Sequence, residues 1–248
     1  MLIGGLQKIT LIDFPGKIAA TVFLSGCSFR CPWCYNPELV LPEKIKDHPK
    51  IPEKDFFDFL KDRKNLLEGV CITGGEPTIN EDLPDFIKKI KKLDYLVKLD
   101  TNGSNPKMLK ELIADKLIDY VAMDIKAPRE KYNETIGMFE QCQPIDPNSS
   151  LNCWSQKILD NVEESVNILK EGNVDFEFRT TIIPTFHKKE DIVKIVRWIS
   201  PAKKYFLQNF RPEKTVNPEF LKIKPYTLKY ILGIQKAIAP FFEVCQVR

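Results

Sequence analysis

Short apolar runs, rich in β-branched and aromatic residues, recur along the chain of 248 residues, and each ends at turn residues. This pattern is typical of buried β-strands. The first run leads into a cysteine-rich loop, and the second ends at Thr73, Gly74 and Gly75. The six predicted strands are 20–24, 69–72, 96–99, 120–123, 175–183 and 205–207.

Amphipathic stretches lie between these runs. Leu83, Phe86 and Ile90, for example, follow the spacing of a helix that is buried on one face. The predicted helices are 53–67, 82–93, 107–117, 159–171, 190–199 and 227–239. Because strands and helices alternate, we predict an α/β fold with parallel strands. Right-handed crossovers would curl this sheet into a partial, open (β/α)6 barrel of the TIM type.

The composition fits one globular domain spanning 1–248, because apolar residues make up 43% and charged residues 29% of the chain. The net charge of +3 is too small to indicate a nucleic-acid partner. We expect no signal peptide, and no apolar run reaches the roughly 18 residues of a membrane span. Seven cysteines, an odd number in a long chain, favour a reducing, cytoplasmic compartment over a secreted disulfide framework.

Polar residues follow the predicted strands at the point where each strand ends. Since the carboxyl ends of parallel strands meet at one edge, and that edge holds the active site in such barrels, we expect these side chains to share one site. The residues concerned are Cys27, Glu76, Asp100, Asp124, Arg179 and Gln208.

Three cysteines on one loop carry the most specific chemistry. Cys27, Cys31 and Cys34 have the spacing C-x3-C-x2-C. Three thiolates can hold three irons of a [4Fe–4S] cube and leave the fourth iron open, whereas ordinary electron-transfer clusters use four cysteines. The alternatives are buried free thiols or a zinc site, which usually needs four protein ligands and would have to recruit His48.

This cysteine loop, with Trp33 between its last two cysteines, and the stretch Thr73-Gly74-Gly75-Glu76-Pro77 together resemble the radical SAM superfamily. The stretches 5–8, 13–16, 24–27 and 34–39 resemble the activating proteins of anaerobic ribonucleoside-triphosphate reductases. Those proteins belong with the pyruvate formate-lyase activating enzymes, which are glycyl-radical activases. The resemblance covers nearly the whole chain.

The resemblance implies a [4Fe–4S] cluster on Cys27, Cys31 and Cys34 and S-adenosyl-L-methionine at the open iron. Reductive cleavage would yield a 5′-deoxyadenosyl radical, which takes a hydrogen atom from a glycine of a partner enzyme. The implied partner is a glycyl-radical enzyme, in particular a class III ribonucleotide reductase, with flavodoxin or ferredoxin as electron donor. We expect an oxygen-sensitive enzyme of anaerobic metabolism that has no membrane partner.

Several residues are implied in binding the cofactor. Trp33 would pack beside the cluster and the adenine. Gly74 and Gly75 would let the backbone approach the methionine part closely. Glu76 would accept a hydrogen bond from the methionine amino group or hold its own loop.

Asp100, Thr101, Asn102, Asp124 and Lys126 match family positions that line the same cavity. In the pyruvate formate-lyase activating enzymes this region also binds a monovalent cation, and hard oxygen ligands would serve it here. Ala122 departs from that pattern, because those enzymes carry a carboxylate at its position. Lys126 would contact the carboxylate of S-adenosylmethionine or pair with Asp124.

Two further strand residues complete the predicted site. Arg179 lies in an apolar strand and needs a partner, which would be a carboxylate or ribose hydroxyl of the cofactor or an internal salt bridge. Gln208, or its neighbour Asn209, would touch the nucleoside. His187 lies in a lysine-rich turn and is expected to be exposed.

Two other functions stay open. Tyr35, where relatives commonly have histidine, Ala122 and the insertion 142–154 give weight to a radical SAM enzyme that modifies a small molecule or a tRNA base. This insertion lies in the polar segment 132–156, an expected lid or docking loop. The lysine-rich stretch 88–92 would then meet phosphates, or simply be a solvated face. The other hypothesis is a non-enzymatic iron–sulfur sensor or assembly factor. The stretch 74–77 argues against it, because a sensor needs no pocket for S-adenosylmethionine. An auxiliary cluster is not expected from Cys71, Cys142, Cys153 and Cys245, because their spacing lacks a C-x-x-C pair.

Overall fold

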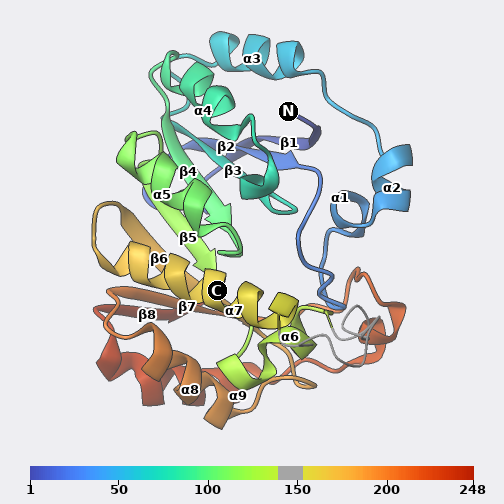
Figure 1. Cartoon of the computed structure of the whole chain (residues 1–248), viewed down its shortest axis with the longest axis vertical. Coiled ribbons are helices and arrows are strands. Elements are labelled where there is room, and N and C mark those ends of the chain that lie inside the picture. The colour runs from blue at the N-terminus through green and yellow to red at the C-terminus, as the bar shows by residue number, and fades with distance from the viewer. Residues whose placement is uncertain (139–152) are drawn as a thin grey trace.

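One eight-stranded sheet organises the molecule (Figure 1), and its strands follow one another in sequence order. The computed structural model describes residues 1–138 and 153–248. The first strand pairs antiparallel with the second, and every later pair is parallel. The strands are β1 (Ile3–Thr10), β2 (Ala19–Leu24), β3 (Gly69–Gly74), β4 (Leu96–Thr101), β5 (Tyr120–Asp124), β6 (Asp175–Ile182), β7 (Lys204–Asn209) and β8 (Val244–Val247).

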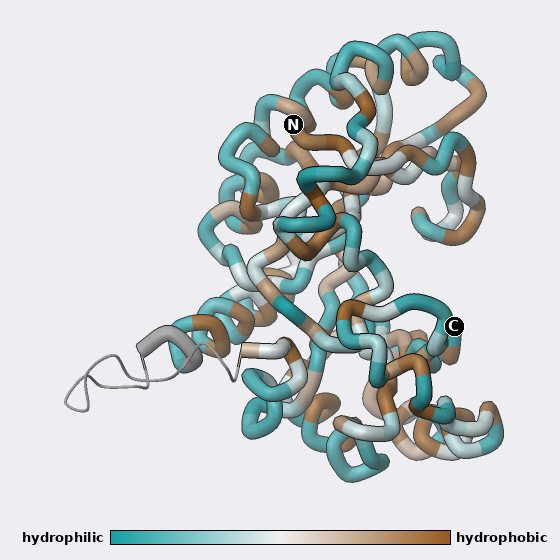
Figure 2. The backbone as a smooth tube through the Cα atoms, turned by 90° about the vertical axis from the view of Figure 1, so that its right-hand side faces the viewer, coloured by the Kyte–Doolittle hydropathy of each residue, from teal (hydrophilic) through white to brown (hydrophobic). Residues whose placement is uncertain are grey.

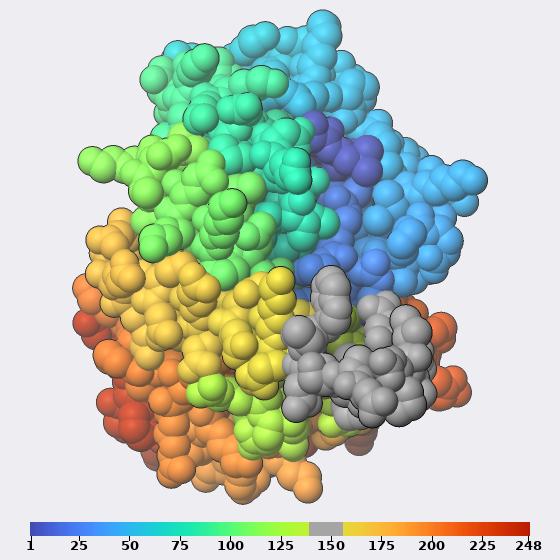
Figure 3. Space-filling view, in the orientation of Figure 1, coloured from blue at the N-terminus to red at the C-terminus, as the bar shows by residue number. Residues whose placement is uncertain are grey.

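The six predicted strands are confirmed, in order, as β2 to β7. The structure adds β1 and β8, which end the sheet on its two sides and are not paired with each other within the described residues. The sheet is therefore open, as predicted for a partial barrel. The N-terminal half of the chain forms the upper part of the molecule and the C-terminal half the lower part (Figure 3).

The six predicted helices are also present, with shifted ends. The predicted helices 53–67 and 107–117 end earlier than expected. Asn65 and Lys116 adopt left-handed backbone angles (φ of 70° and 54°), through which a helix cannot continue. The helices are α1 (Pro37–Val40), α2 (Pro42–Asp47), α3 (Glu53–Asp62), α4 (Leu83–Lys91), α5 (Pro106–Ala114), α6 (Tyr132–Thr135), α7 (Cys153–Lys170), α8 (Lys189–Ile199) and α9 (Leu228–Ile238).

The core lies between the sheet and the apolar faces of the long helices. Hydropathy alternates along these helices (Figure 2), as expected when one face is buried. In α4, Phe86 and Ile90 are fully buried, whereas Lys88 and Lys89 are exposed and pair with Asp85 and Glu53. The lysine-rich stretch is thus a solvated, ion-paired face.

The predicted insertion 132–156 begins with ordered structure. Its first residues form α6, where Tyr132 is fully buried, and Ile136 behind it is also buried. Residues 139–152 lie outside the described part of the chain, so the prediction of a lid remains a prediction. No helix among the described residues has the length and apolar character needed to cross a bilayer.

Candidate functional site

A cavity of about 750 Å³ lies at the carboxyl ends of the parallel strands, and every predicted site residue lines it. Its walls come from both halves of the chain, from β1 and the cysteine loop at one side to the segment after β7 at the other. The predicted residues found there are Cys27, Cys31, Trp33, Cys34, Gly74, Gly75, Glu76, Asp100, Thr101, Asn102, Asp124, Lys126, Arg179 and Gln208.

The cysteine loop is fixed to the end of β3 by the main chain. Gly75 N donates to Leu24 O at 2.8 Å, and Glu76 N donates to Gly26 O at 2.8 Å. A Cβ atom at Gly75 would lie 1.8 Å from Gly26 O, and Gly74 has a φ of 121°. These glycines therefore let the cysteine loop itself approach β3, a need for glycine separate from the cofactor contact expected from sequence.

The three thiols share the cavity wall. Cys31 is buried and Cys27 and Cys34 are half-buried. Burial raises the pKa of Cys27 to about 12 and also raises the pKa values of Cys31 and Cys34, so all three are neutral thiols until a metal takes their protons.

The donor set fits a cluster that takes one thiolate on each of three irons. Among the described residues, no three His, Cys, Asp or Glu side chains surround one point where a single metal ion would lie. A cluster does not need such a point, because each thiolate binds a different iron. A zinc site would need a fourth ligand, and His48 does not supply it. His48 Nε2 lies 2.7 Å from Gly4 O, and His48 is absent from the described cavity lining.

Of the other cysteines, Cys71 is buried in β3 and Cys245 half-buried in β8. Cys142 and the side chain of Cys153 lie outside the described residues.

Glu76 ties the ends of β3 and β4 together. Its fully buried carboxylate accepts hydrogen bonds from Thr78 N (3.1 Å), Thr78 Oγ1 (2.6 Å), Thr101 Oγ1 (2.7 Å) and Asn102 N (2.6 Å). Asn102 Nδ2 in turn lies 3.8 Å from Cys27 Sγ. Glu76 was expected either to bind the methionine amino group or to hold its own loop, and these contacts show that it holds the loop.

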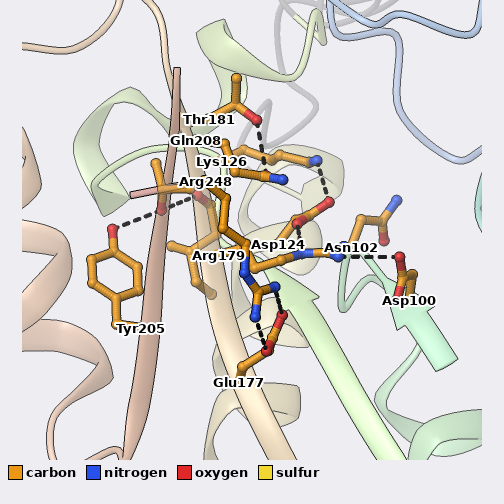
Figure 4. Close-up of polar contacts among 12 residues, drawn as sticks. Asp100, Asn102, Asp124, Lys126, Glu177, Arg179, Thr181, Tyr205, Gln208 and Arg248 are labelled. Atoms are coloured by element: carbon orange, nitrogen blue, oxygen red, sulfur yellow. Dashed lines mark hydrogen bonds and ion pairs between the residues drawn. The ribbon is translucent and has the colours of Figure 1, made fainter. Parts of the chain in front are cut away.

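A chain of alternating charges crosses the cavity floor (Figure 4). Arg179 lies between two aspartates: its Nη1 is 3.1 Å from Asp100 Oδ2 and its Nε 2.8 Å from Asp124 Oδ1. Lys126 Nζ is 3.0 Å from Asp124 Oδ2. Burial works to raise the pKa of Asp124, but Arg179 and Lys126 outweigh it and hold the pKa below its usual range. The internal pairings considered for Arg179 and Lys126 are therefore present.

Trp33 and His187 also hold Lys126 in position, one at its side chain and the other at its backbone. Its Nζ lies 5.1 Å from the centre of the buried Trp33 ring, within the range of a cation–π contact. His187 Nδ1 accepts from Ile183 N at 3.1 Å, so Nε2 carries the proton and donates to Lys126 O at 2.8 Å. The expectation that His187 is exposed was wrong: it is fully buried, and burial lowers its pKa to about 4.

The segment after β7 closes one wall of the cavity. Arg211 N donates to Tyr35 Oη at 2.8 Å, and the Tyr35 ring stacks on Phe210 with centres 6.0 Å apart. Val216 N donates to Cys34 O at 3.1 Å, so this segment also holds the cysteine loop. Tyr35 therefore has a structural role in this wall. Gln208 Oε1 accepts from Thr181 Oγ1 at 3.5 Å.

Sequence reasoning missed several charged residues of the site. Arg248 lines the cavity and forms a bidentate pair with Glu177, at 2.7 and 3.2 Å (Figure 4). Lys98, two residues before Asp100, is buried inside the barrel and pairs with Asp100. Glu177 and Lys98 each stand as a charged residue within an apolar strand, and this pattern could have identified them as residues of the site.

Comparison with known proteins identifies the family of this chain. The family model of the radical SAM superfamily matches residues 21–199. A protein of Methanocaldococcus jannaschii, named provisionally as a glycyl-radical enzyme activating enzyme, is 34% identical over 225 residues, which are 90% of this chain and 85% of that protein. The pyruvate formate-lyase-activating enzyme of Clostridium pasteurianum is 26% identical over 245 residues, 94% of this chain and 84% of that enzyme.

Solved structures agree on the fold. Streptococcus suis SuiB bound to its precursor peptide SuiA matches 92% of this chain with a TM-score of 0.64 at 16% identity, and this chain spans 48% of SuiB. The family match extends from β2, which leads into the cysteine loop, to the end of α8, and so includes most strands that build the cavity. The chain belongs to the radical SAM superfamily and is an enzyme similar to the glycyl-radical enzyme activating enzymes.

Proposed function

We propose that this enzyme cleaves S-adenosylmethionine reductively and makes a glycyl radical in a partner enzyme. The observation that carries the proposal is the gathering of Cys27, Cys31 and Cys34 on one wall of a cavity in a chain that aligns along most of its length with an activating enzyme. When bound, a [4Fe–4S] cluster and S-adenosylmethionine supply the electron and the 5′-deoxyadenosyl radical that takes hydrogen from the glycine.

Different residues would hold the cluster and S-adenosylmethionine. Cys27, Cys31 and Cys34 would each hold one iron. Lys126 would bind the carboxylate of S-adenosylmethionine, because it lines the cavity and pairs with a single carboxylate, that of Asp124, among the residues that the structure describes. Arg179, already bonded to two aspartates, would instead fix the cavity floor.

The open side of the sheet supports a macromolecular substrate. Gln7 of β1 and Arg248 beyond β8 both line the cavity, so it reaches the strands that flank the opening. A loop of a partner enzyme can enter there. We infer a class III ribonucleotide reductase as partner, from the resemblance of the N-terminal stretches, and flavodoxin or ferredoxin as electron donor.

The test is anaerobic. The protein is loaded with iron and sulfide, reduced and mixed with S-adenosylmethionine, and 5′-deoxyadenosine is measured. We expect product from the wild type and from Cys245→Ala, and none from the Cys27→Ala, Cys31→Ala, Cys34→Ala triple variant. Adding a class III ribonucleotide reductase should then produce a glycyl radical signal in electron paramagnetic resonance. Equal product from the triple variant would overturn the proposal.

A second candidate is a radical SAM enzyme that modifies a small molecule or a tRNA base. It is favoured by the basic side chain of Arg211 in the cavity wall, which suits phosphates or carboxylates. Lys214 and Arg248 line the same wall but already pair with Glu38 and Glu177. The partner assay separates the two functions. Cofactor cleavage with no glycyl radical on either class III ribonucleotide reductase or pyruvate formate-lyase would favour this second function.

A further inference from the structure

The buried ammonium group of Lys98 is the least expected charge in the barrel. Lys98 and Asp100 are two residues apart on β4, so their side chains point to the same face of the sheet. The Lys98 side chain is 1% exposed, and its Nζ forms a short ion pair with Asp100 Oδ1 and lies 3.7 Å from Cys71 Sγ. A buried ammonium is retained only where a partner compensates its charge, and here that partner is Asp100.

Every carboxylate oxygen of Asp100 and Asp124 faces a cationic side chain. At Asp100, Lys98 occupies Oδ1 and Arg179 occupies Oδ2. At Asp124, Arg179 occupies Oδ1 and Lys126 occupies Oδ2. Together with Thr101, whose Oγ1 donates to Glu76 Oε1, these aspartates are the residues that the family resemblance suggests as ligands for a monovalent cation.

A further cation does not fit this arrangement. Three fixed positive charges already face two carboxylates, so an added ion would meet net repulsion in a poorly solvated place. Ala122, at the position of the expected carboxylate, has a methyl side chain and therefore no side-chain oxygen to offer a cation. Burial works to raise the pKa of Asp100, but Arg179 and Lys98 outweigh it and keep the group ionised.

We propose that the ammonium group of Lys98 takes the place of the monovalent cation at Asp100, so that this enzyme needs no added alkali cation. An ammonium carries the same charge as K⁺ and, being tethered, loses no translational freedom on binding. The part of the proposal that concerns S-adenosylmethionine rests on the proposed function. The part that concerns Lys98 and Asp100 can be tested on the protein without its cofactors.

The first experiment is thermal unfolding of the full chain in KCl, NaCl or choline chloride at equal ionic strength. We expect one Tm for the wild type in all three salts. Lys98→Ala leaves Asp100 Oδ1 facing a space that an alkali ion can fill, so its Tm should rise saturably in KCl over choline chloride, by about 3 °C or more. The double variant Lys98→Ala, Asp100→Asn lacks the carboxylate and should show no preference among the salts.

A wild-type Tm that rises saturably with K⁺ or Na⁺ relative to choline would overturn the proposal. So would a Lys98→Ala protein that folds and shows no preference among the salts. Should Lys98→Ala fail to fold, Lys98→Met keeps most of the stem without the charge, and the wild-type measurement decides the cation requirement on its own.

The second experiment measures 5′-deoxyadenosine formation by the reconstituted wild type in the same salts. We expect rates within twofold of one another, and a larger increase with K⁺ or Na⁺ would overturn the proposal. If no product forms in any salt, the proposed function fails, while the unfolding experiment still decides whether Lys98 replaces a cation.

Discussion

Glu76 and Asp100 lie at the ends of neighbouring strands, and the chain stabilises their carboxylates in opposite ways. Glu76, just past β3, is fully buried and accepts four hydrogen bonds from uncharged donors. Asp100, in β4, has a side chain 15% exposed and faces Lys98 and Arg179. Burial outweighs the hydrogen bonds at Glu76 and raises its pKa, whereas the two cations outweigh burial at Asp100 and lower its pKa.

The difference separates a mechanical role from an electrostatic one. Around Glu76 the hydrogen bonds fix loops, including Asn102 beside Cys27, so the arrangement determines where the cluster cysteines lie. Around Asp100 the charges set the electrostatic potential of the cavity floor. Substitutions in the two places should therefore damage the protein differently.

Removing the shared cation should have the largest effect. Arg179→Met leaves Asp100 and Asp124 each without one partner, and we expect a loss of about 3–5 kcal/mol in the free energy of unfolding. Denaturation in urea at pH 7 measures it. Arg179→Lys keeps a charge that cannot bridge both aspartates and should lose less. An Arg179→Met protein as stable as the wild type would show that the pairs contribute no net stability.

Removing the acceptor at Glu76 should come next. Glu76→Ala leaves four donors to find other partners, and we expect a loss of about 2–3 kcal/mol. Glu76→Gln keeps one carbonyl oxygen that can accept the three hydrogen bonds now made to Oε1, so it should lose less stability. Its amide nitrogen replaces Oε2, the acceptor of Asn102 N, so that one bond is lost. The same urea titration measures both variants. If Glu76→Ala and Glu76→Gln lose the same free energy of unfolding, the oxygen that accepts three of the four hydrogen bonds contributes little to stability.

The pH dependence should differ in sign between the two carboxylates. Asp100 has a lowered pKa, so it stabilises the fold above its unfolded pKa of about 3.9, and this contribution is lost as pH falls through the folded pKa. Glu76 has a raised pKa, so its contribution is present below about 4.3 and is lost as pH rises through the folded pKa.

Unfolding free energies measured from pH 2 to pH 7 test this contrast. Asp100→Asn should lose less stability than the wild type when the solution is acidified below about pH 4, and Glu76→Gln should lose less when pH rises above about 4.3. Parallel curves for the two variants would contradict the opposite pKa directions.

An exposed ion pair gives the smallest expected effect. Lys88 pairs with Asp85 on the outer face of α4, with 49% of its side chain exposed. Because solvent screens such pairs, we expect Lys88→Ala to change the Tm by less than about 1 °C and to leave 5′-deoxyadenosine formation unchanged. A larger change, measured by thermal unfolding, would mean that exposed charges matter as much as the pairs around Arg179.

The sequence was sufficient for the strand order because each strand from β2 to β7 carries its own apolar run and turn. It was insufficient for the edges of the sheet. β1 contains Gly4 and Gly5 and three consecutive exposed residues, so its pattern lacks the apolar run of a buried strand. β8 has four residues, too few for a periodicity.

For the site, the position of each residue was predictable and its partner was not. Parallel strands end together, so their last residues share a cavity whatever they contact. Whether Arg179 meets cofactor or aspartate depends on register, which places Asp124 opposite Arg179. His187 shows the same limit. Its neighbours Lys188 and Lys189 suggest an exposed position, but the Nε2–H of His187 donates a hydrogen bond to Lys126 O, 61 residues away in the sequence.

The main-chain bonds between the cysteine loop and β3 have a consequence for how the protein tolerates substitution. Gly75 N and Glu76 N donate to Leu24 O and Gly26 O, so backbone atoms join the loop to the sheet. Replacing the cysteines removes the atoms that would hold iron and leaves these main-chain donors and acceptors in place. A protein without the three thiols should therefore keep its fold while it loses the capacity to bind iron, so that loss of the cluster can be told apart from loss of the loop.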